Sequence, residues 1–216
     1  MFVGHYAAAL ALRAAEPRAP LWGYVAACQL MDIGWGALIM TGAEKFSVNP
    51  DLPGSPLELY HMPYTHSLPG ALAWSVGGAL LARGLLKTPW RASVFVGLAV
   101  FSHWLLDFLV HRPDLELWFG AEKVGLGWWN YPIPEATLEM GLLAAAGAGW
   151  AWVRAREGLS VWPAATFLLV LTGVQIASKL APMGSDPVPT GAMAIGIYLA
   201  VAAVAWLVER RPGRIA

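Results

Sequence analysis

The sequence has a single cysteine and few charged residues. Because Cys28 is alone among 216 residues, no disulfide can form within the chain. The same count excludes a thiolate-rich zinc site, so any metal ion would have to be bound by nitrogen and oxygen atoms. Charged residues make up 13% of the chain and cancel to a net charge of zero. No basic surface of the kind that binds nucleic acid is therefore expected.

Apolar residues, by contrast, are abundant in the chain. Hydrophobic residues make up 57% of it, and the mean hydropathy is +0.54, well above the range of ordinary soluble domains. Six apolar segments are close to the ~20 residues that cross a bilayer as a helix. They are residues 21–42, 67–86, 91–110, 135–153, 161–180 and 191–208. We predict an all-α fold, a polytopic membrane helix bundle that forms one integral membrane domain over residues 1–216.

A shorter apolar segment, residues 2–15, precedes the six and ends at Glu16-Pro17. It is too short for a comfortable full crossing, so we expect a short helix that dips into the membrane beside the bundle. Residues 1–16 lack the basic start and the cleavage site of a signal peptide and are expected to stay in the mature protein.

The basic residues predict the orientation of the bundle. Ten of the 14 fall on one side of the six segments, and Lys45, Arg112, Lys123 and Lys179 fall on the other. The ten are Arg13, Arg18, Arg83, Lys87, Arg91, Arg154, Arg156, Arg210, Arg211 and Arg214. Because cytoplasmic loops carry the excess of Lys and Arg, the C-terminus is expected in the cytoplasm and loops 43–66, 111–134 and 181–190 outside.

Three ionisable residues stand at the end of the apolar segment 91–110 or just beyond it. His103, Asp107 and His111 are spaced four apart, so on a helix they form one polar stripe. A histidine and a carboxylate one turn apart can bind a divalent metal ion without bending the backbone. The alternative is a hydrogen-bonded His–Asp pair that joins helices.

Other polar residues fall at a similar depth. Asp32 lies in the middle of an apolar segment, where a carboxylate costs at least ~2.5 kcal/mol and needs a partner. Counting ~1.5 Å per residue from the basic ends puts it in one layer of the outer half of the membrane with His5, His66 and Glu139. We predict a site with His5, Asp32, His66, His103 and Asp107 as metal ligands, Glu139 as the catalytic base, and His61 and His111 behind the ligands. Asp114 and Glu116, in the following loop, are expected to be solvated.

The chain resembles the YdjM-like family of membrane-bound, metal-dependent hydrolases of bacterial inner membranes. The resemblance rests on His5 in an N-terminal helix, on the His-x-x-x-Thr-His-Ser motif at 61–67, and on the His-x-x-x-Asp motif at 103–107. It extends over residues 1–140. Two positions depart from the family pattern, because Met31-Asp32-Ile33-Gly34 replaces a Pro-Asp-x-Asp motif and Met62 replaces an arginine.

The resemblance implies a metal-dependent hydrolase of the inner membrane. A ligand set of nitrogen and carboxylate oxygen suits zinc, and also manganese or iron. The expected substrate is a lipid-like ester or phosphoester near the outer leaflet, and the expected surroundings are the lipid bilayer. Two other functions remain open at this stage: a metal- or proton-coupled transporter, and a non-catalytic membrane subunit that binds a metal or haem. The sequence does not indicate an oligomeric state.

Overall fold

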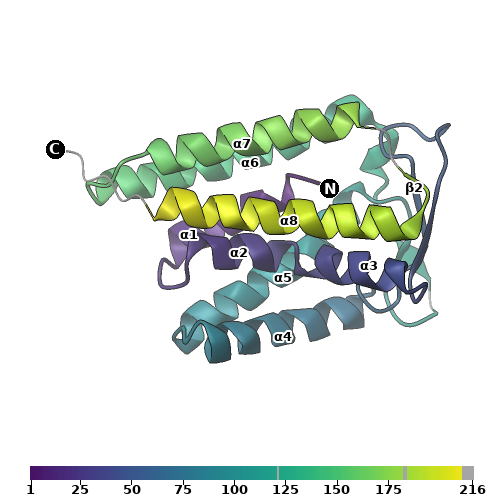
Figure 1. Ribbon diagram of the computed structural model, residues 1–216, viewed down its shortest axis with the longest axis horizontal. Coiled ribbons are helices and arrows are strands. Elements are labelled where there is room, and N and C mark those ends of the chain that lie inside the picture. The colour runs from purple at the N-terminus through teal and green to yellow at the C-terminus, as the bar shows by residue number, and fades with distance from the viewer. Residues whose placement is uncertain (121, 182–183, 211–216) are drawn as a thin grey trace.

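The computed structural model describes residues 1–120, 122–181 and 184–210, of which 67% are helical. Within these residues eight α-helices run roughly along the long axis of an elongated bundle (Figure 1). They are α1 (His5–Ala15), α2 (Leu21–Cys28), α3 (Leu30–Met40), α4 (Leu68–Leu85), α5 (Trp90–Val110), α6 (Pro132–Arg156), α7 (Trp162–Leu180) and α8 (Pro187–Glu209). Each predicted apolar segment therefore coincides with helix.

Three of the described helices, α5, α7 and α8, are long and apolar enough to cross a membrane, and α2 with α3 adds a fourth if the bent pair is counted as one span. The six expected transmembrane helices are confirmed only to this extent. Helix α6 carries Glu135, Glu139, Arg154 and Arg156, and α4 is rich in glycine and alanine. The charged residues of α6 and the glycines of α4 lower the mean hydropathy of these segments, although their lengths and helical form match the expectation.

The expectation of one continuous helix over residues 21–42 was wrong. The chain breaks at Gln29, where φ is −113° and ψ is 8°, and the two halves are bent by 47°. The helical ladder resumes when Ile33 N–H donates to the Gln29 carbonyl. The break brings Asp32 into the first turn of α3, where the helix dipole favours a negative charge.

Helix α1 lies inside the bundle, not beside it as expected. It contacts α2, α5 and α6, and five residues of its N-terminal half are buried: His5, Tyr6, Ala7, Ala9 and Leu10. The physical reason is that this half presents apolar side chains in two directions, and only a position between several helices covers them. The central position of α1 brings His5 to the middle of the molecule.

Two small β-hairpins, which the all-α expectation omitted, gather at one end of the bundle. Strands β1 (Lys45–Val48) and β2 (Leu57–His61) pair antiparallel, and so do β3 (Leu115–Glu116) and β4 (Lys123–Val124). A single 3₁₀ turn, η1 (Trp128–Asn130), leads into α6. Arg112 ties these loops together, because its guanidinium donates to Asn130 Oδ1 and to the carbonyls of Pro53 and Ser55.

The connections α1–α2, α4–α5 and α6–α7 lie at the opposite end (Figure 1). Seven of the basic residues that were assigned to the cytoplasmic side lie in or near these connections, and Arg210 follows α8; Arg211 and Arg214 lie outside the described residues. Arg13 pairs with Glu209 at 2.7 Å and links α1 to α8 there. Hydrogen bonds from Arg18 lower the pKa of Glu16 to about 2, against the opposing effect of burial.

Candidate metal centre

Six polar side chains from four parts of the chain meet inside the bundle. The four parts are α1, α3, the turn before α4, and the C-terminal half of α5 with the residue after it. The side chains are His5, Asp32, His66, His103, Asp107 and His111. Asp32 is the most open of them, with 16% of its side chain exposed, whereas the other five show 5% or less. The structure therefore brings the five predicted ligands together, with His111 beside them.

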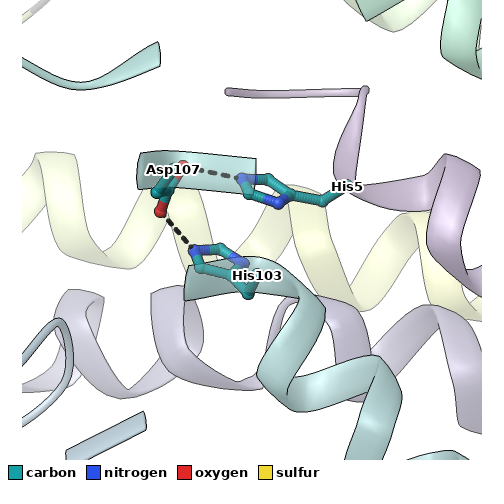
Figure 2. A group of neighbouring side chains, drawn as sticks. All are labelled: His5, His103 and Asp107. Carbon is teal, nitrogen blue, oxygen red and sulfur yellow. Dashed lines mark ion pairs between the residues drawn. The ribbon is translucent and has the colours of Figure 1, made fainter. Parts of the chain in front are cut away.

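Asp107 stands at the centre of the six, with two imidazoles at each of its oxygens. Its Oδ2 lies 3.0 Å from His103 Nε2 and 3.6 Å from His66 Nε2. Its Oδ1 lies 3.1 Å from His5 Nε2 and 3.3 Å from His111 Nε2. Figure 2 shows the carboxylate beside the stacked rings of His5 and His103, with an ion pair to each of them; the ring centroids are 3.8 Å apart. The stripe predicted on α5 is present, because both i, i+4 pairs are in contact.

Two groups of three residues in this cluster could hold a metal ion, Asp32 with His66 and His103, and His5 with His103 and Asp107, because the ligand atoms of each group lie within 4.8 Å of one another. Asp32 Oδ1 lies 3.4 Å from both His66 Nε2 and His103 Nε2, and the contacts of these two nitrogens with Asp107 Oδ2 are 3.6 and 3.0 Å. Zinc bonds of ~2.0–2.1 Å in a tetrahedron put neighbouring ligand atoms ~3.3–3.4 Å apart. The four contacts among these atoms, which are four of the six edges of a tetrahedron, agree with that value to within about 0.4 Å. The other oxygen of Asp107, Oδ1, contacts His5 and His111 and also the Met1 amino group.

The outward nitrogens of two imidazoles are held in a way that fixes the tautomer. His103 Nδ1 lies 2.7 Å from the Cys28 carbonyl, which can only accept a hydrogen bond. His66 Nδ1 lies 2.7 Å from Thr65 Oγ1, and the Thr65 hydroxyl donates in turn to the buried carboxylate of Glu44. Both Nδ1 atoms therefore carry a proton, and in their neutral form the rings would turn the lone pair of Nε2 inward. This is the arrangement of histidine ligands whose other nitrogen is fixed by a neighbouring acceptor.

The bend at Gln29 and the orientation of His103 are connected. The Cys28 carbonyl that accepts from His103 belongs to the last residue of α2, directly before the break. At that position the carbonyl is available to a side chain of another helix, since the last carbonyls of a helix have no partner within it.

A hydrogen-bonded His–Asp network accounts poorly for these contacts. His5 Nε2 and His103 Nε2 are buried and make no hydrogen bond within the described chain, although carboxylate oxygens lie 3.1 and 3.0 Å away. The His66 contacts of 3.4 and 3.6 Å exceed the usual hydrogen-bond range. Neutral imidazoles in this arrangement would turn Nε2 lone pairs toward carboxylates, and a bound divalent cation would remove that repulsion, so the residues fit a divalent metal ion.

Lysine and arginine side chains of the described residues do not balance the negative charges of Asp32 and Asp107. No Lys or Arg in the described ranges pairs with Asp32 or Asp107, and the one cationic group in contact is the Met1 amino group, 2.9 Å from Asp107 Oδ1. Two buried carboxylates thus share a single permanent positive charge.

His111 is closer to the centre than expected and has its own support. Its Nδ1 lies 2.9 Å from Asp114 Oδ1, and its ring packs on Trp129 at a centroid distance of 4.0 Å. Burial lowers the pKa of His111, but the Asp107 and Asp114 carboxylates outweigh it and raise the pKa. The expectation that Asp114 and Glu116 are solvated was wrong, because both are largely buried, at 12% side-chain exposure for Asp114 and 6% exposure for Glu116.

Two predicted residues lie outside the six-residue cluster. Glu139 on α6 accepts hydrogen bonds through Oε1 from the Phe2 and Gly4 backbone and through Oε2 from Gln175 Nε2. It thereby joins the segment before His5 to α6, and both its oxygens are engaged. His61 ends β2, opposite Lys45 of β1, and none of its recorded contacts within the described chain reaches the cluster. Their predicted roles remain predictions.

Sequence reasoning missed several residues that hold the site. Tyr198 on α8 donates to Asp32 Oδ2 at 2.7 Å, and Glu44 accepts from the Tyr64 and Thr65 backbone as well as from the Thr65 hydroxyl. Thr65 stood beside His66 in the quoted motif, which is a usable signal. Nothing in the sequence linked Glu44 or Tyr198 to the site, since both act across long separations along the chain.

The comparison with protein families now bears on this geometry. The model of the family described as YdjM inner membrane protein matches residues 1–181. The chain belongs to this family. A search of the curated proteins and a search of the solved structures each found no match. The family name and the apolar helices together support a protein of the inner membrane. The match covers every predicted site residue and ends before α8, so the contact between Tyr198 and Asp32 lies partly beyond it.

Proposed function

We propose that this YdjM family member is a zinc-dependent hydrolase embedded in the inner membrane, acting on a lipid-like ester or phosphoester near the outer leaflet. The observation that carries the proposal is the group of four inward atoms from Asp32, His66, His103 and Asp107. Their four known contacts are close to the ligand spacing of a tetrahedral zinc ion, and hydrogen bonds donated by Nδ1 of both imidazoles leave Nε2 available to a metal.

The chain's own residues supply binding and orientation. Asp107 offers its two oxygens to separate pairs of imidazoles, so it can hold one ion or bridge two. Bound zinc would lower the pKa of a water molecule and polarise the scissile bond. Trp129 and the loop clamped by Arg112 cover His111 and limit the access of bulk water from that side.

The proposed topology has six membrane crossings, a cytoplasmic C-terminus and a site in the outer half. Its support is that the hairpins and the basic connections lie at opposite ends of the bundle (Figure 1). The hairpin end also exposes large aromatic side chains, of the kind that settle at the level of lipid headgroups. They are Tyr60, Tyr64, Trp118, Phe119, Trp128 and Tyr131. A lipid headgroup at this level would be close to His66 and His111.

The first test is the metal content of the purified protein. We expect at least one zinc ion per chain by elemental analysis, loss of that ion on chelation with a fall in melting temperature, and recovery of both when zinc is returned. Hydrolysis of vesicles made of phosphatidylglycerol and phosphatidylethanolamine should follow the zinc content. A metal-free preparation with unchanged melting after chelation and re-addition would refute the proposal in favour of a structural network.

Glu139→Gln tests the proposed catalytic base. If Glu139 takes the proton from water, the variant keeps its zinc and loses hydrolysis, because glutamine cannot accept that proton. Its side chain must also still accept from Phe2 and Gly4, so melting temperature and zinc content are measured alongside the rate. Gln175→Ala removes a donor to the same carboxylate and serves as the control. Full hydrolysis by the glutamine variant would exclude a role for Glu139 as the base.

A further inference from the structure

Tyr198 is the contact of α8 with the polar cluster. Its hydroxyl donates to Asp32 Oδ2 at 2.7 Å across 166 residues, and the ring is 8% exposed. The family match ends at residue 181, so this helix lies outside it. Neither composition nor spacing marks Tyr198, which stands in an apolar helix.

The two oxygens of Asp32 have separate partners. Oδ1 faces His66 Nε2 and His103 Nε2 at 3.4 Å each, and Oδ2 accepts from Tyr198. A carboxylate that ends a short side chain can turn about its terminal bond, and this rotation would exchange the two oxygens or present both. The hydrogen bond to Tyr198 opposes the rotation. The hydrogen bond thus restrains Asp32, which at 16% side-chain exposure is the most open residue of the cluster.

Tyr198 is itself held firmly, because α8 lies against α3. Gly191 approaches the backbone of Gly36 so closely that a Cβ at Gly191 would collide with the Gly36 carbonyl. Tyr198 follows Gly191 by seven residues, about two helical turns, so it lies on the same face of α8 and meets α3 near its start. The close contact between Gly191 and Gly36 therefore also fixes the position of the Tyr198 phenol relative to α3.

We propose that Tyr198 is a positioning residue of the metal centre, which orients Asp32 so that only Oδ1 is presented to the ion. This inference rests on the proposed function, because it requires a metal at the cluster. It extends the site from the family-matched segment to α8.

Tyr198→Phe tests it, because this substitution removes only the hydroxyl. We expect the affinity for zinc to fall by roughly 10- to 100-fold, as is typical when a group behind a metal ligand is lost. The probe is zinc itself, titrated into the chelated full-length protein. Cobalt-substituted protein should also show a shifted visible absorption spectrum, since a turned Asp32 changes the ligand geometry.

Tyr24→Phe is the matched control. Tyr24 is also buried and donates one hydrogen bond, at 2.9 Å, to the Glu16 carbonyl away from the cluster. Both variants should lose a similar amount of stability, whereas only Tyr198→Phe should change zinc affinity and the cobalt spectrum. Wild-type values for both readouts in Tyr198→Phe would overturn the inference. A wild-type protein that binds no zinc would instead overturn the proposed function.

Discussion

Replacing Asp107 with asparagine is expected to abolish zinc binding. The side chain keeps its shape but loses the charge that faces His5, His66, His103 and His111. The loss of affinity should exceed the roughly 100-fold that marks the loss of a group behind a ligand, because Asp107 would be a ligand itself. Elemental analysis and zinc titration of the purified variant measure the effect.

Asp186→Asn is the control for this substitution. Asp186 precedes α8 and accepts from Val188 N–H, a capping contact that asparagine also makes, so zinc content should be unchanged. After chelation, the Asp107 variant should still melt below the wild type because its ion pair with Met1 is lost, but the difference should be smaller than with zinc bound. Stoichiometric zinc in the Asp107 variant would mean that the ion is bound elsewhere.

Gly191→Ala is expected to lower the free energy of unfolding by about 1–3 kcal/mol, the usual cost of overfilling a tight contact. An added methyl group would meet the Gly36 carbonyl and lie 2.7 Å from Met40 Cγ, so α8 and α3 must separate. Because these helices carry Tyr198 and Asp32, the separation should also weaken zinc binding. Unfolding in detergent and zinc titration give the two readouts.

Gly196→Ala provides a control on the same helix. No atom lies within 4 Å of a Cβ at that position, so the methyl group fits. Alanine is the better helix former by up to about 1 kcal/mol, so the stability of this variant should be equal or higher. Equal effects of the two substitutions would show that α8 does not depend on close backbone contact with α3.

Much of the site was predictable from spacing along the helices. The four-residue intervals between His103, Asp107 and His111 predicted a shared face, and both pairs are in contact. Depth in the membrane predicted that Asp32 and His66 would join them, because apolar segments of similar length cross in parallel. These arguments use local periodicity, which the sequence contains in full, together with the general thickness of a lipid bilayer.

The interior position of α1 and the hairpins were not predictable in the same way. A short apolar helix can lie beside a bundle or within it, and the choice depends on which other helices can cover His5, Tyr6 and Leu10. The loop 43–66 was expected as a connection between two apolar segments. Its pairing of β1 with β2 depends on hydrogen bonds between strands, for which short mixed segments give little signal.

The sequence by itself determined the class of the protein, the helical segments, and the set of histidines and carboxylates that share a depth. Tertiary structure alone decided how each of these side chains is oriented. The Cys28 carbonyl fixes His103 because α2 breaks there, Glu44 fixes His66 through Thr65, and Tyr198 fixes Asp32 from α8. The physical reason is that hydrogen bonds act over about 3 Å in space, whatever the separation along the chain. Periodicity can bring ligands to one layer, but only the packed helices direct their atoms to a common point.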